Sequence, residues 1–320
     1  MKTTFLNFEK QTVTAILILA VLASMQITFA QTEVDGEVAG VWDREGSPFI
    51  AVEDILVAEG EELIIEPGVE VQFQARRTMT VLGTLTAAGE AENLIRFSSF
   101  GEDPEIWGSG LCFEGDESRV SLDYSIIENQ IVDTNDEDWL NRGGGIRILG
   151  GVHQINNSVI QNCQAGIGGG LYLNGGLCEV GNSEFIENQA RTTGGGVFST
   201  AGLKLIDCRL FGNSTGNEDQ PGMTAIYIGQ EDESDDSLVV TGCRLEGNLE
   251  TEMAAFGIAN VDCPHNFAFN EIIDNDSPGF VFINSGFGPA LIIDHFTIYG
   301  NTLGVGGGTM GDAIVTNSIL

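Results

Sequence analysis

The stretch GNSEFIENQARTTGGGVFST, residues 181–200, contains the pattern that decides the fold of this chain. A short alternating segment ends at Asn188, and three consecutive glycines, Gly194 to Gly196, precede a second alternating segment. Glycine triplets followed by such segments recur as GGGLYL from Gly168 and GGGIRI from Gly143. Because the triplet repeats and lacks the strand-turn-helix setting of a nucleotide loop, it indicates a tight corner in a repeated unit.

Asparagine recurs at the end of seven similar segments along the chain. By subtraction, successive asparagines lie 33, 26, 25, 35, 27 and 26 residues apart. The two long intervals contain the acidic insertions IVDTNDEDWLNR and GQEDESDDS, which we interpret as loops. We expect the seven residues to form a structural, hydrogen-bonded ladder: Asn129, Asn162, Asn188, Asn213, Asn248, Asn275 and Asn301.

Each repeat is too short to bury a hydrophobic face by itself. The residue three positions before each asparagine is apolar, and inward positions recur with the spacing of two that marks one face of a strand. Stacking one repeat on the next would bury a continuous core. The sequence therefore predicts an all-β protein, a right-handed single-stranded parallel β-helix (solenoid) with about 25–27 residues per turn, or rung.

The pairing of FIEN with GGGV resembles the FxxN and GGA-type repeats of chlamydial polymorphic outer-membrane proteins and of bacterial right-handed β-helix repeat proteins with the pectin-lyase-like fold. The segment from Leu63 to Ser99 is similar to the opening rungs of many exported β-helix proteins, with Leu94 where a proline usually stands. The resemblance covers nearly all of residues 35–320. It implies an architecture that carries lyases, hydrolases, tailspikes and adhesins alike, so it does not by itself imply an activity.

The first thirty residues are typical of a secretory signal peptide. Lys2 and Lys10 precede a short apolar run, and a small-residue segment closes at Ala30. The run is too short to span a bilayer comfortably, so we expect no membrane span after signal removal. We divide the chain into the signal peptide (1–30), an N-terminal cap with the first rungs (31–110), and β-helix repeats with acidic loop insertions (111–320). We expect the mature protein to be secreted or at the cell surface, either extracellular or associated with the outer membrane.

The final residues, VTNSIL, match the beginning of INNSVIQN within an earlier repeat. If Asn317 corresponds to Asn157, the next ladder position falls two residues beyond the sequence. We therefore expect the chain to stop inside a rung, as a truncated fragment would, and to be a monomer or part of a longer chain.

The charge balance excludes one class of partner. The sequence has 47 acidic and 13 basic residues, for a formal net charge of -34. We expect no nucleic-acid partner, because so few cations could neutralise phosphates. The acidic turns at Thr134 to Trp139 and at Asp274 to Ser277 predict weak calcium binding at most, and we expect no dedicated metal site and no cofactor.

The six cysteines show no CxxC pair. Cys208 and Cys243 fall in the same inward column on consecutive rungs, so a disulfide and a pair of buried free thiols both remain open.

The sequence offers no catalytic constellation. Asp235 and Asp236 lie in an acidic run that we interpret as a solvated loop. The histidines, His153, His265 and His295, share no repeat position, and we expect them at the surface or in turns. Arg209 and Arg244 occupy equivalent positions, so we expect them to stack outward on adjacent rungs and to offset nearby acidic loops.

One outward column could bind a ligand. In IRI, LYL, VFS, IYI and VFI the middle residue faces solvent if its neighbours face the core. Aromatic rings in such a column could contact sugars or a protein, or could stack on one another and stabilise the sheet. The candidate ligand-binding stripe is Arg147, Tyr172, Phe198, Tyr227 and Phe282.

These observations favour an exported, non-catalytic β-helix surface or secreted protein, acting as a rigid stalk or adhesin-like binding surface for polysaccharides or surface proteins. The alternative is a polysaccharide lyase or glycoside hydrolase of the pectin-lyase-like type. Carboxylates and a basic residue over one groove would favour the enzyme, whereas a continuous aromatic stripe would favour binding.

Overall fold

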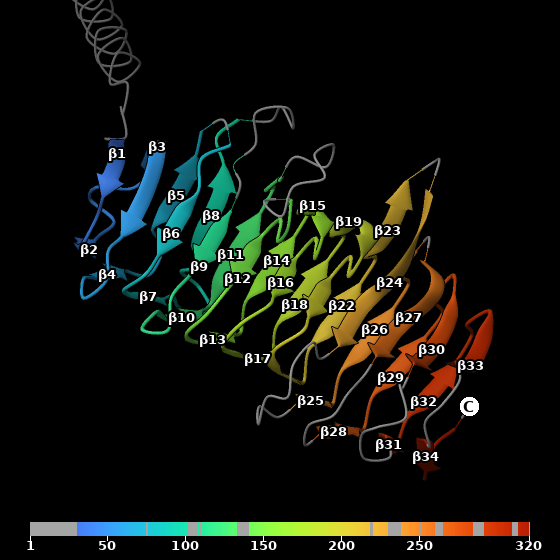
Figure 1. Cartoon of the computed structure of the whole chain (residues 1–320). Helices are drawn as coiled ribbons and strands as arrows, with labels where there is room; N and C mark the ends of the chain where they lie inside the picture. Colours follow the sequence, from blue (N-terminus) through green and yellow to red (C-terminus); the bar gives the residue numbers. More distant parts are fainter. Residues whose placement is uncertain are drawn as a thin grey trace, which may run out of the picture. The chain divides into compact units, whose positions relative to one another are not determined.

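The computed structural model describes residues 31–74, 76–101, 108, 110–132, 141–217, 220–229, 238–249, 251–259, 265–283, 291–308 and 313–319. The chain divides into two units, Met1–Ala30 and Gln31–Leu320, and the second contains the described residues. Its elements are all β-strands, and successive strands of each repeat pair in parallel with their equivalents one repeat later (Figure 1). The predicted parallel β-helix is confirmed.

Each rung contributes strands to three parallel faces, which we number in chain order. The first face contains β2 (Gly40–Trp42), β4 (Glu62–Ile65), β7 (Thr84–Ala88), β10 (Arg119–Asp123), β13 (Val152–Asn156), β17 (Leu177–Gly181), β21 (Gly202–Ile206), β25 (Leu238–Thr241), β28 (His265–Ala268), β31 (Leu291–Asp294) and β34 (Ala313–Thr316). The second face contains β5 (Glu70–Phe73), β8 (Ile95–Ser99), β11 (Ser125–Glu128), β14 (Val159–Gln161), β18 (Glu184–Ile186), β22 (Arg209–Phe211), β26 (Arg244–Glu246), β29 (Glu271–Ile273) and β32 (Thr297–Tyr299). The third contains β6 (Met79–Val81), β9 (Leu111–Phe113), β12 (Ile146–Ile148), β16 (Leu171–Leu173), β20 (Val197–Ser199), β24 (Gln220–Gly229), β27 (Thr251–Ala259), β30 (Pro278–Ile283) and β33 (Leu303–Gly308).

The N-terminal rung and one side of the solenoid depart from this plan. The long strand β3 (Phe49–Val57) pairs with β5 through its first residues and with β6 through its last, and β1 (Thr32–Glu37) pairs with β3. Between the second and third faces, β15 (Gln164–Ile167), β19 (Gln189–Thr193) and β23 (Ser214–Asn217) form a short extra ladder.

The core is a set of inward columns that run along the solenoid. In the middle of the second face, consecutive strands contribute Ile160, Phe185 and Leu210, all fully buried. Towards the C-terminus, the ring of Phe280 packs edge-to-face against Phe256 at 5.3 Å and against Phe296 at 5.9 Å. Each such side chain contributes about 1.5–3 kcal/mol by burial, so stacking of rungs supplies the stability that one rung lacks.

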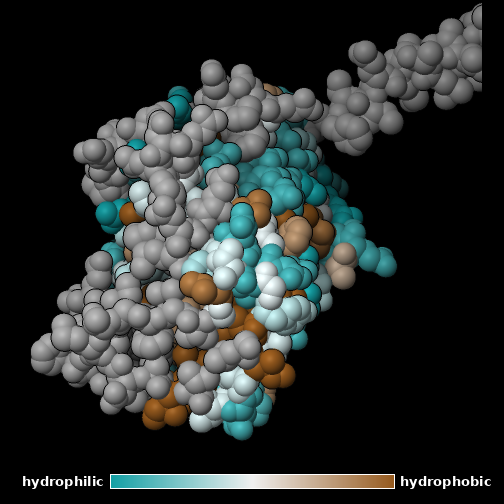
Figure 2. Space-filling view, turned by 90° about the vertical axis from the view of Figure 1, so that its right-hand side faces the viewer, coloured by the Kyte–Doolittle hydropathy of each residue, from teal (hydrophilic) through white to brown (hydrophobic). Residues whose placement is uncertain are grey.

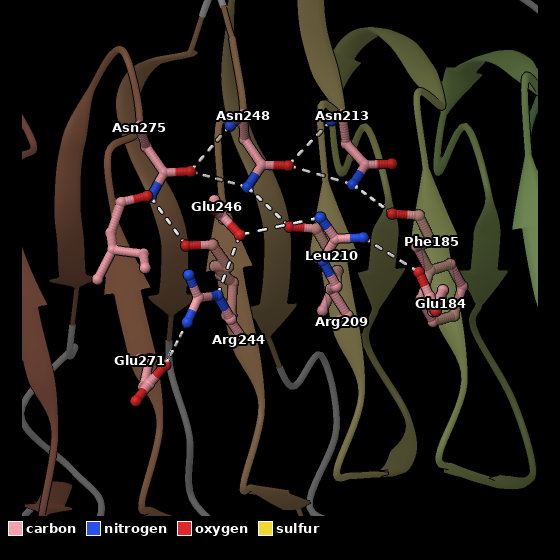
Figure 3. Close-up of polar contacts among 12 residues, drawn as sticks. Glu184, Phe185, Arg209, Leu210, Asn213, Arg244, Glu246, Asn248, Glu271 and Asn275 are labelled. Carbon is pink, nitrogen blue, oxygen red and sulfur yellow. Dashed lines mark hydrogen bonds and ion pairs between the residues drawn. The ribbon is translucent and has the colours of Figure 1, made fainter.

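An asparagine ladder runs through five consecutive rungs at the end of the second face. The Oδ1 of Asn248 accepts hydrogen bonds from the main-chain N of Asn213 (2.9 Å) and from its Nδ2 (3.1 Å). The Oδ1 of Asn275 accepts the same two hydrogen bonds from Asn248 (Figure 3). Nδ2 of Asn213 also donates to the Phe185 carbonyl at 2.9 Å. The ladder consists of Asn188, Asn213, Asn248, Asn275 and Asn301.

The prediction that Asn129 and Asn162 belong to the ladder is wrong by one residue. Strand register pairs Ile160 with Phe185, which puts Cys163 opposite Asn188, and the Cys163 N–H donates to Asn188 Oδ1 at 3.1 Å. The equivalent position in the rung before is Gln130 rather than Asn129, because Ile127 pairs with Ile160.

Asn129 and Asn162 instead form corners of the solenoid. Their φ angles are 56° and 53°, the left-handed conformation that Glu187 and Gly212 hold at the same corner of later rungs. Asparagine tolerates this region better than most residues, which explains its presence at these corners.

The glycine triplets form the corner that precedes the third face, as predicted. Gly168 and Gly194 have φ angles of 66° and 68°, and the N–H groups of Gly169 and Gly170 donate to the carbonyls of Gly194 and Gly195 at 3.0 and 3.1 Å. A Cβ atom on Gly169 would lie 2.5 Å from the Gly195 carbonyl oxygen and closer still to that of Gln189. The corner therefore requires glycine for close approach of the backbones.

The face of the molecule shown in Figure 2 carries both hydrophilic and hydrophobic side chains among the described residues. Seen from the side nearest β33, brown hydrophobic groups alternate with teal hydrophilic ones (Figure 2). The exposed apolar side chains of the last strands include Leu303 and Ile314. No helix in the described part of the chain is long and apolar enough to cross a membrane.

Candidate functional site

The predicted outward stripe follows one column of the third face. Strand pairing places Arg147 opposite Tyr172, Tyr172 opposite Phe198, and Phe198 opposite Tyr227. These four residues lie on four successive strands, β12, β16, β20 and β24, as expected from the sequence.

Phe282 does not belong to this column. Tyr227 pairs with Gly257, and Gly257 pairs with Val281, so Phe282 stands one residue out of register, opposite Ile258 of the inward-facing set. Successive strand residues face opposite sides, so a shift of one residue moves a position from one side of the sheet to the other. The register therefore ends the aromatic part of the stripe at Tyr227.

The three aromatic rings of the stripe stack on one another. The ring centroids of Tyr172 and Phe198 lie 5.2 Å apart with an interplanar angle of 4°, and those of Phe198 and Tyr227 lie 5.1 Å apart at 8°. Phe198 is half-buried between its two neighbours. Because each face of its ring is covered by an aromatic neighbour, a sugar ring could reach only the edge of Phe198.

Arginine side chains close the other end of the stripe. Tyr172 is only 2 % exposed, its Oη accepts a hydrogen bond from Arg142 at 2.8 Å, and the same guanidinium lies 5.4 Å from its ring centroid. Arg147 donates to Cys112 Sγ at 3.1 Å and lies 3.7 Å from the Glu114 carboxylate. The cationic member of the stripe is thus held by neighbouring residues.

Replacing Phe198 with leucine should lower the free energy of unfolding by about 2 kcal/mol, because two stacked pairs are lost and each contributes about 0.5–1.5 kcal/mol beyond burial. Urea denaturation of both proteins measures the difference. Phe211→Leu is the matched control, since Phe211 contacts the Arg209 guanidinium at 4.5 Å without a stacked ring on either side among the described contacts. Equal losses for the two variants would contradict a stabilising stack.

Arg209 and Arg244 lie outward on adjacent strands of the second face, as predicted, and join a chain of carboxylates (Figure 3). Arg209 lies 3.2 Å from Glu184 and 3.9 Å from Glu246, and Arg244 lies 3.0 Å from Glu246 and 2.9 Å from Glu271. The hydrogen bond from Arg244 holds the pKa of Glu246 below its usual value. These arginines link neighbouring rungs, and each is already shared between two carboxylates.

The expectation that all three histidines lie at the surface or in turns is wrong for His153. This side chain is 1 % exposed, packs against the ring of Phe113 at 5.1 Å, and donates from Nε2 to the Gly150 carbonyl at 2.6 Å, while Nδ1 has no partner. His153 and His265 also share one inward column of the first face, through Cys178, Leu203 and Leu238. His295 is at a corner, with φ of 51°, stacked on Phe269.

Burial of His153 predicts an acid-sensitive contribution to stability. Desolvation lowers the pKa of this imidazole in the folded chain, so below about pH 6.5 the unfolded chain takes up a proton that the folded chain does not. Stability should fall as the pH decreases from 6.5, by about 1.4 kcal/mol per pH unit from this group, until the lowered folded pKa is reached. Denaturant titrations from pH 8 to pH 5 measure the slope.

His153→Leu is the test of that assignment, because Leu203 occupies the same column two rungs later. The variant should lose this part of the pH dependence and keep the contribution of the carboxylates at lower pH. An unchanged slope between pH 6.5 and pH 5 would contradict it.

Several predicted positions bear on metal binding. Among the described residues, no group of three or more His, Cys, Asp or Glu side chains is placed to hold a metal ion. At the turn from Asp274 to Ser277, Asp274 forms a corner with φ of 51° and Asn275 is in the ladder. Asp235, Asp236 and the turn 134–139 lie outside the described residues.

Five cysteines fall in the part of the chain that the structure describes, and all five are buried free thiols; Cys263 lies outside it. Burial raises the pKa of Cys163 to about 12, so its thiol stays protonated at neutral pH. Of the two alternatives for Cys208 and Cys243, the structure has free thiols. They stack on adjacent rungs, as the sequence predicted.

A second polar ladder, which the sequence did not predict, lies at the corner between the first and second faces. The N–H of Ser125 donates to Ser158 Oγ at 3.0 Å, and that of Ser158 donates to Ser183 Oγ at 3.1 Å. Cys208 and Cys243 continue this column, and the Cys243 N–H donates to Asn270 Oδ1 at 2.9 Å. The signal that could have revealed it is the recurrence of small polar or thiol side chains at one repeat position.

Comparison with known proteins adds no relative. No protein-family model, no curated protein and no solved structure matched the chain.

Proposed function

We propose that this chain is an exported, non-catalytic parallel β-helix that serves as a rigid stalk, secreted or held at the cell surface. The observation that carries the proposal is that outward side chains contact those of neighbouring rungs along the axis of the solenoid. The rings of Tyr172, Phe198 and Tyr227 stack on one another, and Arg209 and Arg244 bind carboxylates of neighbouring rungs. Side chains that could bind a ligand or act as a base therefore join rungs together.

The sequence supports the same proposal. The basic, apolar and small-residue order of residues 1–30 favours export, and a net charge of -34 favours a solvated, extended surface. The likeness of FIEN and GGGV to FxxN and GGA-type surface repeats also favours a surface protein. A stalk needs such repeats for length and stiffness rather than for a localised active site.

A panel of acidic and neutral polysaccharides, with and without calcium, tests the absence of catalysis. We expect no depolymerisation of any member by the full chain, measured as new reducing ends and as unsaturated products. Release of either product would overturn the proposal and favour the lyase or hydrolase.

The same panel tests whether the stripe is a binding site. If a polysaccharide is retained, Phe198→Leu should bind it as the parent chain does, because both faces of this ring are already covered. Loss of binding in Phe198→Leu, with a folded variant, would assign the ligand site to the stripe instead.

Export can be tested separately with a reporter fused after residue 60 in a bacterial host. We expect the reporter outside the cytoplasm with residues 1–30 present and inside it after their deletion. A reporter that stays in the cytoplasm in both cases would contradict export and therefore a location at the cell surface.

A further inference from the structure

Two stacked thiols occupy the polar ladder between the first and second faces. Cys208 and Cys243 precede Arg209 and Arg244, which pair directly in parallel register, and the Arg244 N–H donates to the Cys208 carbonyl at 2.9 Å. Both thiols are buried; Cys208 donates to the Ile206 carbonyl at 3.4 Å and Cys243 to the Thr241 carbonyl at 3.5 Å. The interaction between the two neighbouring thiols raises the pKa of Cys243 and lowers that of Cys208. The strand register thus stacks the two thiols on adjacent rungs.

The spacing of parallel strands suits a bridging ion better than a disulfide. Equivalent atoms of paired strands lie about 4.8 Å apart, whereas a disulfide requires Cβ atoms about 3.8 Å apart. Two collinear metal–thiolate bonds of about 2.3 Å each would span about 4.6 Å. Stacked cysteines with equal side-chain orientation therefore match a linear sulfur–metal–sulfur unit.

The residues around the two thiols favour an ion that is stable with two sulfur ligands. Among the described residues no third His, Cys, Asp or Glu completes a larger ligand group. A tetrahedral zinc site would need four ligands, whereas thiolates select monovalent copper. We propose that Cys208 and Cys243 form a two-coordinate binding site for one soft monovalent cation of the Cu(I) and Ag(I) class.

The corner that precedes the two thiols in the chain is exposed to solvent. Asp207 and Gly242, the residues before the two cysteines, are exposed, and the Asp207 carboxylate lies against Gly242, which has no side chain to cover the corner. The Asp207 carboxylate places a negative charge at this corner. Binding of one monovalent ion by two thiols releases two protons to solvent and leaves a bis-thiolate complex with one net negative charge; no oxidant or reductant is required.

Serine variants test the site without disturbing the fold. Ser125, Ser158 and Ser183 occupy this ladder in earlier rungs, and Ser183 Oγ donates to the carbonyl two residues before it, as the Cys208 thiol does. Cys208→Ser and Cys243→Ser should therefore fold. Cys163→Ser, at a buried thiol on a different corner, is the matched control.

Native mass spectrometry of the reduced full chain, titrated with Cu(I) or Ag(I) under anaerobic conditions, measures the stoichiometry. We expect one ion retained at one equivalent by the parent chain and by Cys163→Ser, with two protons displaced. Cys208→Ser and Cys243→Ser should lose it, and zinc should not be retained. X-ray absorption should show two sulfur ligands and no others.

Three results would overturn the proposal. The first is an absence of any retained ion in the parent chain. The second is retention that survives either serine variant, which would mean adventitious binding elsewhere. The third is a parent chain, purified without reductant, that is two hydrogens lighter only when both Cys208 and Cys243 are present, which would assign the pair to a disulfide.

Discussion

Replacing Asn213 with alanine should lower the free energy of unfolding by about 4 kcal/mol. The change removes the acceptor used by the main-chain N and the Nδ2 of Asn188, and the donors to the Phe185 carbonyl and to Asn248 Oδ1. All of these groups are buried or lie in the ladder, and each buried polar group left without a partner costs about 1–3 kcal/mol. Equilibrium denaturation in guanidinium chloride measures the loss.

Asn162→Gly is the matched control, because the sequence pattern alone would assign Asn162 the same role. The structure places Asn162 at a corner with φ of 53°, a conformation that glycine adopts without steric strain. The change should therefore alter the free energy of unfolding by no more than about 0.5 kcal/mol. A loss equal to that of Asn213→Ala would show that the ladder extends to Asn162 and would contradict the strand register that pairs Ile160 with Phe185.

Replacing Gly169 with alanine should prevent the chain from folding into the β-helix or destabilise it by more than about 4 kcal/mol. The new methyl group would lie 2.5 Å from the Gly195 carbonyl oxygen and against the Gln189 carbonyl, both backbone groups of the next rung. Relief of the clash would separate two rungs and break the parallel hydrogen bonds that join Gly169 to Gly194. Thermal unfolding followed by circular dichroism measures the effect.

Gly115→Ala separates steric contact from backbone strain. Gly115 has φ of 82°, but a Cβ atom there would meet nothing within 4 Å. This control should cost only about 1–2 kcal/mol, the penalty for a left-handed alanine. If both variants lost the same stability, close approach of the rungs would not be the reason for the glycine triplets.

The repeat made the fold predictable, but it did not reveal which asparagines form the hydrogen-bonded ladder. A solenoid follows from short alternating segments that recur every 25–27 residues, whatever their individual residues. The ladder was misplaced at Asn129 and Asn162 because asparagine suits two adjacent positions for different reasons. One position needs a side-chain amide that bonds along the stack, and the other needs a residue that tolerates positive φ.

The errors at the candidate site have equally local causes. In the segment PGFVFI, both Val281 and Phe282 could be the outward residue, and only the pairing of Val281 with Gly257 decides between them. His153 was misjudged from its polarity, although its repeat position is that of the buried Cys178 and Leu203. Stacking of the aromatic rings could not be foreseen, because a column of outward rings is compatible with both open and mutually covered faces.

The distance between two spin labels on the first face tests the rigid, in-register stack most directly. Ser121 and Asn266 are exposed in one outward column, five rungs apart through Gln154, Glu179, Lys204 and Val239. At about 4.8 Å per rung, the labelled backbone positions should lie about 24 Å apart. Double electron–electron resonance should give one narrow distribution near that value, widened only by the label linkers. A broad distribution, or a maximum displaced by more than two rung spacings, would contradict a rigid parallel β-helix.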